Sequence, residues 1–398
     1  MSCGVVEAKL FNKFEFVEQK LQQRREAHQF RVVAAFDPDS SVQGTRGDRS
    51  FLNFSSNDYL GLSKHPHLIE TAQRYTQRYG TGATASRLVT GTYPIHQQLE
   101  HQLAIACGYE ATLLFSSGFQ ANSTVLPALL DASALVLCDR LVHNSLIQGI
   151  LASHARFMRY RHNDLTHLKS LLEKAARQSY SRIMIVSETV FSMDGDRSDV
   201  TALVQLAQDY NAILYLDDAH ALGVMGKQGM GLAAHQPGID IVVGTFGKAF
   251  GAFGAFVACS QKLRDYLVNY CPGFIYTTAL PPAVVGAIAA ALELVPTLGA
   301  ERQHLNHLAD HLRQQLSQLN YDPGNSSSQI VPVMVGDEAK TLRLSQWLEQ
   351  RGMLAIAIRP PTVEPGTARL RVALSSQHTV AQVDALIHAI GEWHESSH

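Results

Sequence analysis

The 398-residue sequence lacks the features that mark several common classes of protein. It has no long run of lysine or arginine and a formal net charge of only −2, which argues against nucleic acid or an anionic membrane surface as its main partner. Its longest apolar stretch, AVVGAIAAALELV, contains Glu293 and is too short to span a bilayer. The N-terminus is amphipathic and lacks the apolar core of a signal peptide, so we expect a helix there, a cytoplasmic protein and a small-molecule ligand.

Cysteine is scarce, and no CxxC pair occurs among the five cysteines, so the sequence predicts neither a disulfide framework nor a redox motif. We expect reduced, packing residues at Cys3, Cys107, Cys138, Cys259 and Cys271. The HESSH stretch at 394–398 has the spelling of a zinc motif, but it stands at the chain end without a third ligand. We therefore expect a solvated tail and no metal.

Two glycine-rich stretches match nucleotide-binding motifs only in part. GTGATA, from Gly80, follows a helical pattern rather than a strand, so its context does not fit a dinucleotide fingerprint. In GTFGKA the lysine is followed by Ala249 rather than serine or threonine, and Val242 stands where a P-loop has its first glycine. These mismatches disfavour a nucleotide-binding regulatory protein built on a similar sheet. That alternative would gain support if the purified protein had no yellow chromophore.

What the sequence does contain is a regular alternation of short apolar runs and helical patterns. The apolar runs are ATLLFSS, ALVLCD, RIMIVSE, AILYLDD and IDIVVGT, and helical periodicity is clear at 94–107 and 200–210. This alternation predicts βαβ units and a mostly parallel sheet. From about residue 285 the pattern changes to a long helix followed by mixed strands and helices. We expect an N-terminal helix with a connecting segment (1–50), a large domain (51–285) and a small α+β C-terminal domain (286–398), to which the N-terminal helix is joined.

Polar residues follow several predicted strands, where ligands collect in parallel sheets. Asp217 ends one strand and Lys248 follows the next, so a carboxylate and an amine are expected at adjoining strand ends. Either residue alone could be structural, since a buried aspartate at a strand end is more often a turn or cap residue. Together they fit a cofactor site in which the lysine forms a Schiff base and the aspartate keeps a pyridine nitrogen protonated. The protonated ring then draws electrons from the substrate α-carbon.

Other groups fit a phosphate in the same site. Gly118 and Phe119 stand at a predicted strand-to-helix junction, where free backbone N–H groups favour an anion, although a plain helix N-terminus explains them equally well. Thr245 can add a hydroxyl. Thr277 and Thr278 offer two more hydroxyl groups from another loop. In one alternative, this loop belongs to a partner subunit.

The ring of such a cofactor also has candidate partners. His143 has a flat side chain suited to stacking on a ring. His220, Glu188 and Ser192 are potential hydrogen-bond partners of ring substituents.

Six ordered motifs carry a resemblance to a known family: FSSNDYLGLS, FSSGFQAN, ETVFSMDGD, LDDAHALGV, TFGKAFGAFGA and AIRPPTVEPGTARLRVALS. Together they resemble the α-oxoamine synthases, which are fold-type I pyridoxal phosphate enzymes, over about residues 15–390. The resemblance implies an α/β fold-type I transferase whose large domain has a mostly parallel central sheet flanked by helices, with a smaller α+β C-terminal domain. It also implies a homodimer with active sites at the interface.

The substrates are implied by one of these motifs. The IRPPTVEPGTARLR segment most resembles the branch of the family that condenses L-alanine with a pimeloyl thioester in biotin biosynthesis. The expected cofactor is pyridoxal 5'-phosphate, and the expected acyl donor is pimeloyl-CoA or pimeloyl-acyl carrier protein, between which the sequence does not choose.

Catalytic roles follow from the resemblance position by position. It implies that Lys248 holds the cofactor and later acts as acid and base, that Asp217 pairs with the pyridine nitrogen and that His143 stacks on the ring, facing the substrate. His220 and Ser192 would contact ring substituents.

The remaining positions are implied in the same way. Gly118, Phe119 and Thr245 would lie along the cofactor and its phosphate. Asn57 and Arg371 would hold the amino-acid carboxylate, for which a planar two-pronged cation is well matched. The positions near the acyl substrate are Arg31, Arg359 and Thr362.

The sequence departs from the family pattern in two places. Ala221 and Leu222 stand where relatives commonly have glycine and a small polar residue, and the first ten residues have no clear counterpart. Two alternatives stay open: a sister synthase that uses glycine and a short acyl-CoA, and a catalytically silent subunit, which the presence of Lys248 and Asp217 disfavours.

Overall fold

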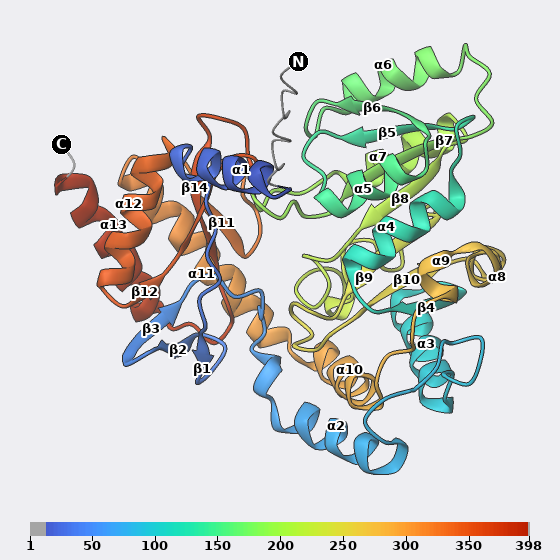
Figure 1. The fold of residues 1–398 in the computed structure, drawn as a ribbon, viewed down its shortest axis with the longest axis horizontal. Coiled ribbons are helices and arrows are strands. Elements are labelled where there is room, and N and C mark those ends of the chain that lie inside the picture. The colour runs from blue at the N-terminus through green and yellow to red at the C-terminus, as the bar shows by residue number, and fades with distance from the viewer. Residues whose placement is uncertain (1–12, 397–398) are drawn as a thin grey trace, which may run out of the picture.

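A computed structural model describes residues 13–396 (Figure 1). Cys3, the first ten residues and the side chains of the HESSH motif lie outside the described part. Half of the molecule is built on a seven-stranded sheet of order β4-β10-β9-β8-β7-β5-β6. Its strands are β4 (Ala111–Phe115), β5 (Leu135–Asp139), β6 (Arg156–Tyr160), β7 (Ile183–Glu188), β8 (Ile213–Asp217), β9 (Ile241–Thr245) and β10 (Ala255–Cys259). Only β10 runs against its neighbours, so the predicted mostly parallel sheet is confirmed.

Both faces of this sheet are buried, because successive apolar residues of a strand pack into two different cores. Leu216 belongs to one core and its neighbour Tyr215 to the other. The helices of this half are α2 (Pro66–Tyr79), α3 (Pro94–Cys107), α4 (Gly118–Leu129), α5 (Asn144–Ala152), α6 (Leu165–Ala175), α7 (Val200–Asp209), α8 (Gln261–Tyr270), α9 (Pro272–Ile275) and α10 (Pro282–Leu294), with short 3₁₀ turns η1 (Leu62–Lys64) and η2 (Lys227–Gly229). The four described cysteines have free thiols and are buried, as predicted.

The other half combines the two ends of the chain. A three-stranded sheet of order β11-β14-β13 consists of β11 (Ile330–Gly336), β14 (Ala368–Ala373) and β13 (Ile356–Ile358). A four-stranded sheet joins β1 (Asp37–Pro38), β2 (Gln43–Arg46) and β3 (Arg49–Asn53) to β12 (Met353–Leu354). The helices here are α11 (Gly299–Gln318), α12 (Glu338–Gln350) and α13 (Val380–Ser396). The expected domain start at residue 51 falls inside β3, which pairs with β12 of the C-terminal region.

The single long helix predicted from about residue 285 is wrong. Helices α10 and α11 meet at a bend of 76°, with the 3₁₀ turn η3 (Val295–Thr297) between them. Pro296 lies in this turn, and a proline ring removes a backbone donor and collides with the preceding helical turn. Within residues 13–396 no single helix is long and apolar enough to cross a membrane, and only this bent pair passes such a test when taken together.

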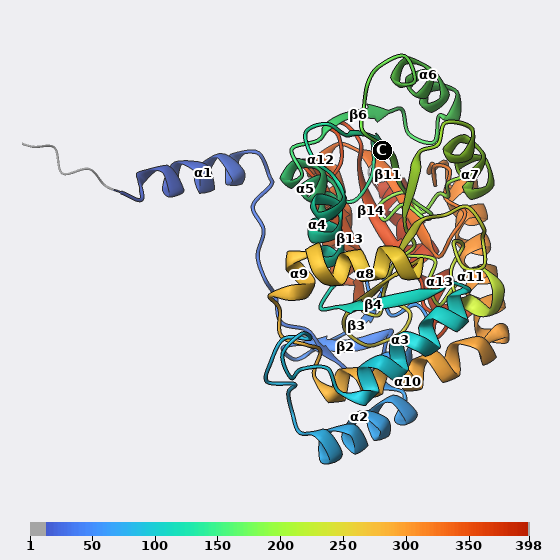
Figure 2. The same ribbon diagram turned by 90° about the vertical axis from the view of Figure 1, so that its right-hand side faces the viewer.

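The predicted N-terminal helix is present as α1 (Glu15–Glu26). None of its residues is buried, and Figure 2 shows it standing out from the rest of the molecule. The segment that follows returns to the C-terminal half, where Arg31 donates a hydrogen bond to Thr362 at 3.0 Å. The expected junction with the C-terminal region is therefore made by the connecting segment rather than by the helix.

Candidate active site

The site lies where the carboxyl ends of β4, β7, β8 and β9 meet at one edge of the central sheet. Two hollows of about 160 and 270 Å³ adjoin there, and they share His143, His220 and Lys248. The smaller is also lined by Gly118, Phe119, Asn122, Ser145, Glu188, Asp217, Ala219 and Thr245. The larger is also lined by Ser55, Asn57, Ser192, Met193, Ile356, Ile358 and Arg371. The structure thus gathers most of the predicted site residues around one continuous space.

Lys248 lies between the two hollows, three residues beyond β9. The surrounding protein disfavours its charged form and lowers its pKa to about 8, although Asp217 and Glu188 oppose this shift. Among the described residues, no ion pair joins the Lys248 amine to a carboxylate at contact distance. A large share of this amine is therefore neutral near pH 8 and able to act as a nucleophile.

This pKa predicts a pH dependence that needs no substrate. In the cofactor-free protein, competitive acetylation of Lys248 should rise with pH to half its maximum near pH 8, because only the neutral amine reacts. The exposed Lys262 is labelled in the same samples and serves to normalise the labelling yield. Mass spectrometry of the labelled peptides measures the curve. A midpoint for Lys248 at about pH 10.4, the value of a free lysine, would contradict the lowered pKa.

Asp217 is a buried carboxylate, with 6% of its surface exposed, and its hydrogen-bond donors are neutral. Asn122 Nδ2 donates to its Oδ2 at 2.7 Å, and the backbone N–H of Ala219 donates to its Oδ1 at 3.0 Å. Tyr215 fixes Asn122 in turn, with its hydroxyl donating to Oδ1 at 2.8 Å. No cation of the described chain pairs with Asp217, so a cationic group of a ligand is the missing partner of this site.

His143 and Glu188 close the same hollow. His143 caps the N-terminus of α5, its Nδ1 lies 2.8 Å from Ser145 Oγ, and its backbone N–H donates to the Glu188 carboxylate. Burial, together with the charge of Asp217, raises the pKa of Glu188 well above its usual value. The imidazole of His143 therefore lies at the wall of the hollow, and the bond from its backbone N–H to Glu188 fixes its position.

Arg371 is a buried guanidinium without a carboxylate partner among the described residues. Its Nε donates to Ser192 O at 2.6 Å, and its Nη2 donates to Asn57 Oδ1 at 3.1 Å. These contacts direct the guanidinium toward the larger hollow, and they leave its positive charge without a counter-charge. An anionic ligand group is the natural partner.

The buried Tyr59 supports this wall by contacting two of its residues, Asn57 and His220. The Tyr59 hydroxyl lies 2.7 Å from His220 Nδ1 and 3.0 Å from Asn57 Oδ1. Burial lowers the pKa of His220 well below its usual value, so the ring is neutral near pH 7. Neither Tyr59 nor Asn122 was predicted as a site residue. Both stand inside quoted motifs, FSSNDYLGLS and FSSGFQAN, and Asn122 lies one helical turn beyond Gly118, which was the signal available for it.

The predicted phosphate end is only partly assembled within one chain. Helix α4 begins at Gly118, and Thr245, which donates to Gly254 O at 3.1 Å, lies beside it on the wall of the smaller hollow. Thr277 and Thr278 do not line either hollow, and Thr278 instead forms a β-bridge with Ser86. The structure therefore does not bring these two threonines to Lys248 of the same chain.

The three residues expected near an acyl group do lie together. Arg31, Arg359 and Thr362 line a further hollow of about 440 Å³, which shares Ile356 and Ile358 with the larger of the two central hollows. Burial and the neighbouring Arg31 charge lower the pKa of Arg359. Both guanidinium groups therefore belong to one hollow, whose described lining contains no carboxylate.

Comparison with known proteins identifies the family of the chain. Residues 49–390 match the family model of the class I and II aminotransferases. The 8-amino-7-oxononanoate synthase of Gluconacetobacter diazotrophicus is 52% identical over 382 residues, covering 94% of this chain and 96% of its own. A high-resolution structure of SPT with PLP has a TM-score of 0.89 at 25% identity, covering 98% and 99% of the two chains. The 8-amino-7-oxononanoate synthase from Francisella tularensis has a TM-score of 0.77 at 26% identity, covering 87% and 98%.

Proposed function

The chain belongs to the class I and II aminotransferase family and, within it, to the α-oxoamine synthases, and we propose that it makes 8-amino-7-oxononanoate from L-alanine and a pimeloyl thioester. The other products are carbon dioxide and the free thiol. It is a pyridoxal phosphate enzyme with a fold-type I architecture. The observation that carries the proposal is a set of three uncompensated groups, Lys248, Asp217 and Arg371, around one space in a chain 52% identical to a named synthase.

These residues fit the cofactor. A protonated pyridine nitrogen would give the buried Asp217 carboxylate its missing cation, and the amine of Lys248 can hold the aldehyde carbon. When bound, pyridoxal phosphate supplies an electron sink that stabilises negative charge on the α-carbon of an amino acid. His143 would stack on the ring, and Gly118, Phe119 and Thr245 would lie toward the phosphate. Glu188, Ser192 and His220 would contact ring substituents.

The chain's own residues then handle the amino acid. Arg371 and Asn57 bind the carboxylate of L-alanine, which orients its α-hydrogen toward Lys248. Because the pKa of Lys248 is lowered, its freed amine can remove that proton near neutral pH and return one later. The apolar side chains of Ile356 and Ile358 stand where the acyl donor must approach and limit water there.

A direct assay tests the reaction. Purified, cofactor-loaded protein is given pimeloyl-CoA with L-alanine or with glycine, and thiol release, carbon dioxide and the amino ketone are measured. We expect all three products with L-alanine. Release only with glycine would favour a sister glycine C-acyltransferase, and no release with either amino acid would contradict the proposed reaction.

The acyl end of the substrate gives a separate prediction. Replacing Arg359 with alanine should raise KM for the pimeloyl thioester about tenfold, since a charge-assisted contact of roughly 1.4 kcal/mol would be lost. Arg31→Ala should act in the same direction, and Thr362, the hydrogen-bond partner of Arg31, belongs to the same subsite. KM for L-alanine should stay within about twofold. Arg343→Ala, an exposed arginine on α12, is the control, and an equal effect there would contradict the assignment.

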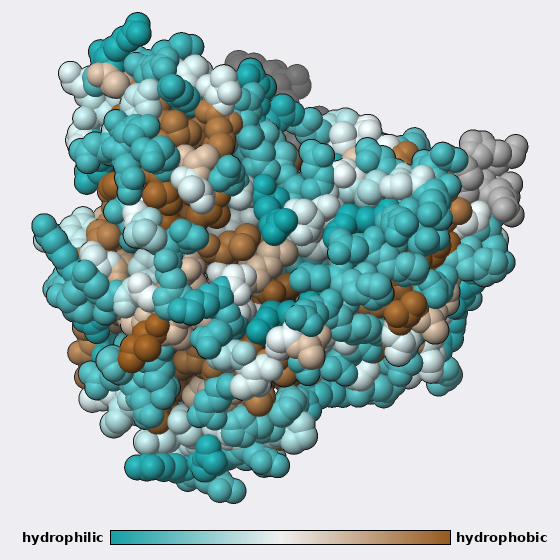
Figure 3. All heavy atoms as spheres, turned by 180° about the vertical axis from the view of Figure 1, so that it is seen from behind, coloured by the Kyte–Doolittle hydropathy of each residue, from teal (hydrophilic) through white to brown (hydrophobic). Residues whose placement is uncertain are grey.

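We also propose that the enzyme is a homodimer whose partner supplies Thr277 and Thr278 to each site. Apolar side chains are exposed at Leu88, Val89, Phe119, Phe253 and Tyr276, and of these Phe119 lines the smaller hollow. Figure 3 likewise shows hydrophobic surface concentrated on the half that holds the central sheet. Sedimentation analysis should find a dimer, and a monomer with full activity would contradict the proposal.

A further inference from the structure

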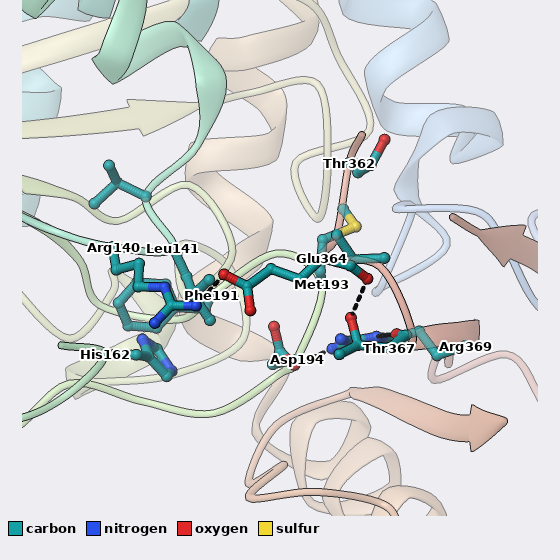
Figure 4. Close-up of a pocket in the computed structure, with 12 residues that line it drawn as sticks. Arg140, Leu141, His162, Phe191, Met193, Asp194, Thr362, Glu364, Thr367 and Arg369 are labelled. Atoms are coloured by element: carbon teal, nitrogen blue, oxygen red, sulfur yellow. Dashed lines mark hydrogen bonds and ion pairs between the residues drawn. The ribbon is translucent and has the colours of Figure 1, made fainter. Parts of the chain in front are cut away.

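Next to the site, His162 joins loops that follow three neighbouring strands, β5, β6 and β7. Its Nδ1 lies 2.9 Å from Asp139 Oδ1, and its Nε2 lies 2.7 Å from Asp196 Oδ2. Figure 4 shows His162 beside Phe191 in a cavity of about 310 Å³, with the Asp194–Arg369 ion pair toward its other side. This cavity shares Met193 with the larger hollow of the site.

The neighbouring carboxylates favour the cationic form of His162. Asp139 and Asp196 are both buried, and one oxygen of Asp196, Oδ1, has no hydrogen-bond partner in the described structure. Burial by itself lowers the pKa of His162, but the two carboxylates outweigh it and raise the pKa to about 10. A neutral side chain at this position would leave two buried carboxylates without a counter-charge, which is costly.

The two carboxylates shape loops that carry site residues. Asp139 accepts the backbone N–H of Leu141 at 2.8 Å, two residues before His143. Asp196 belongs to a tight turn in which Phe191 N–H donates to Asp196 O at 3.0 Å. The His162 ring packs edge-on against Phe191 with their centroids 4.4 Å apart. His162 supplies the charge that joins both loops, and the next residue, Asn163, adds neutral bonds from its backbone N–H to Asp139 Oδ2 at 2.8 Å and from its Nδ2 to Asp196 Oδ2 at 2.7 Å.

The turn at 191–196 in turn holds two arginines of β14. Ser192 O accepts Arg371 Nε at 2.6 Å, and the Asp194 carboxylate pairs with Arg369. Since Arg369 and Arg371 are two apart on one strand, they lie on the same face and are anchored by the same turn. Loosening of the turn would release the guanidinium that faces the larger hollow.

We propose that His162 is a positioning residue for the amino-acid substrate: by bridging Asp139 and Asp196 it fixes the 191–196 turn, and the turn aims Arg371 at the substrate carboxylate. The inference rests on the proposed role of Arg371. A purely structural histidine would affect overall stability without changing amino-acid affinity.

The test compares His162→Gln with a matched control, His311→Gln. His311 makes a similar histidine–carboxylate pair, 2.6 Å from Asp384, with 25% of its side chain exposed against 24% for His162, but it lies on α11 away from the site. Hydrogen exchange of the 191–198 amides in the cofactor-free proteins should be about tenfold faster for His162→Gln than for wild type. The dissociation constant of L-alanine, from titration of the holoenzyme absorbance, should rise about tenfold, and His311→Gln should change neither quantity.

A second variant protects the test against a folding defect. Asp196→Asn keeps the size of the side chain and one acceptor, and it should also speed hydrogen exchange and weaken L-alanine binding. Because His162 and Asp196 act as one unit, the double variant His162→Gln/Asp196→Asn should show effects no larger than those of His162→Gln alone. Additive effects, unchanged exchange at 191–198, or an unchanged alanine affinity in a folded variant would each overturn the proposal. If the wild type binds glycine but not L-alanine, the titration uses glycine. That result counts against the proposed substrate, whereas the comparison of variants still decides the role of His162.

Discussion

Replacing Lys248 with alanine is expected to lower turnover by about 10³-fold or more while leaving the protein folded and able to take up pyridoxal phosphate with L-alanine. The amine is the one group at the junction of the two hollows whose pKa is lowered to about 8, so it combines nucleophile and base in one side chain. The cofactor can still be held by its phosphate end and by Asp217. Thiol release from pimeloyl-CoA measures turnover, and the absorbance change on adding L-alanine measures binding.

The control for this variant is Lys262→Ala, which removes an exposed lysine from the first turn of α8. It should leave both measurements unchanged. If Lys248→Ala retained more than a few per cent of wild-type thiol release, another group would be the base and the role proposed for Lys248 would fail. If the absorbance change were lost together with turnover, the main role of Lys248 would instead be to bind the cofactor or L-alanine.

Replacing Asp217 with asparagine is expected to slow removal of the α-proton by roughly 10²–10³-fold, the cost typical of losing one electrostatic partner of a developing charge. Asparagine is nearly the same size, and its single side-chain oxygen can still accept one of the two hydrogen bonds, from Ala219 N–H or from Asn122 Nδ2. It cannot hold a pyridine nitrogen in its protonated state. Exchange of the α-hydrogen of L-alanine into heavy water isolates this step. Cofactor affinity should weaken by no more than about tenfold, because one of these hydrogen bonds remains.

Asp240→Asn is the matched control for the carboxylate. Asp240 accepts the Leu214 backbone N–H at 2.8 Å at the opposite end of the same strands, and burial raises its pKa as well. It should leave α-hydrogen exchange within about twofold of wild type. Equal losses of cofactor binding and of α-hydrogen exchange in Asp217→Asn would identify a structural carboxylate and contradict the proposed pairing.

The sequence alone was sufficient for the central sheet and for the neighbouring positions of Asp217 and Lys248. Both follow from short-range patterns. A buried parallel strand needs a continuous apolar run, and the residue after such a run must lie at the carboxyl edge. The order of these runs along the chain places β8 beside β9, and therefore the carboxylate beside the amine.

Other parts of the molecule depended on contacts that no local pattern encodes. Asn122 was overlooked although it lies one helical turn beyond Gly118, because that spacing does not show that its side chain bonds to Asp217. The long helix was predicted from the change of pattern at about residue 285, but Pro296 divides it. Thr277 and Thr278 follow α9 in sequence, and the chain carries them away from its own Lys248, with Thr278 paired to Ser86 instead.

What the sequence by itself determined is therefore the layered α/β framework and the chemistry of the strand ends, because periodicity and strand order are local properties. Only the tertiary structure decided that Arg371 is bound by Ser192, that Arg31 meets Thr362, and that His162 is clamped between two carboxylates. The residues of the first two pairs are 179 and 331 positions apart. Contacts at such separations depend on how the two halves of the molecule pack against each other, and that packing depends on many weak interactions acting together rather than on any one motif.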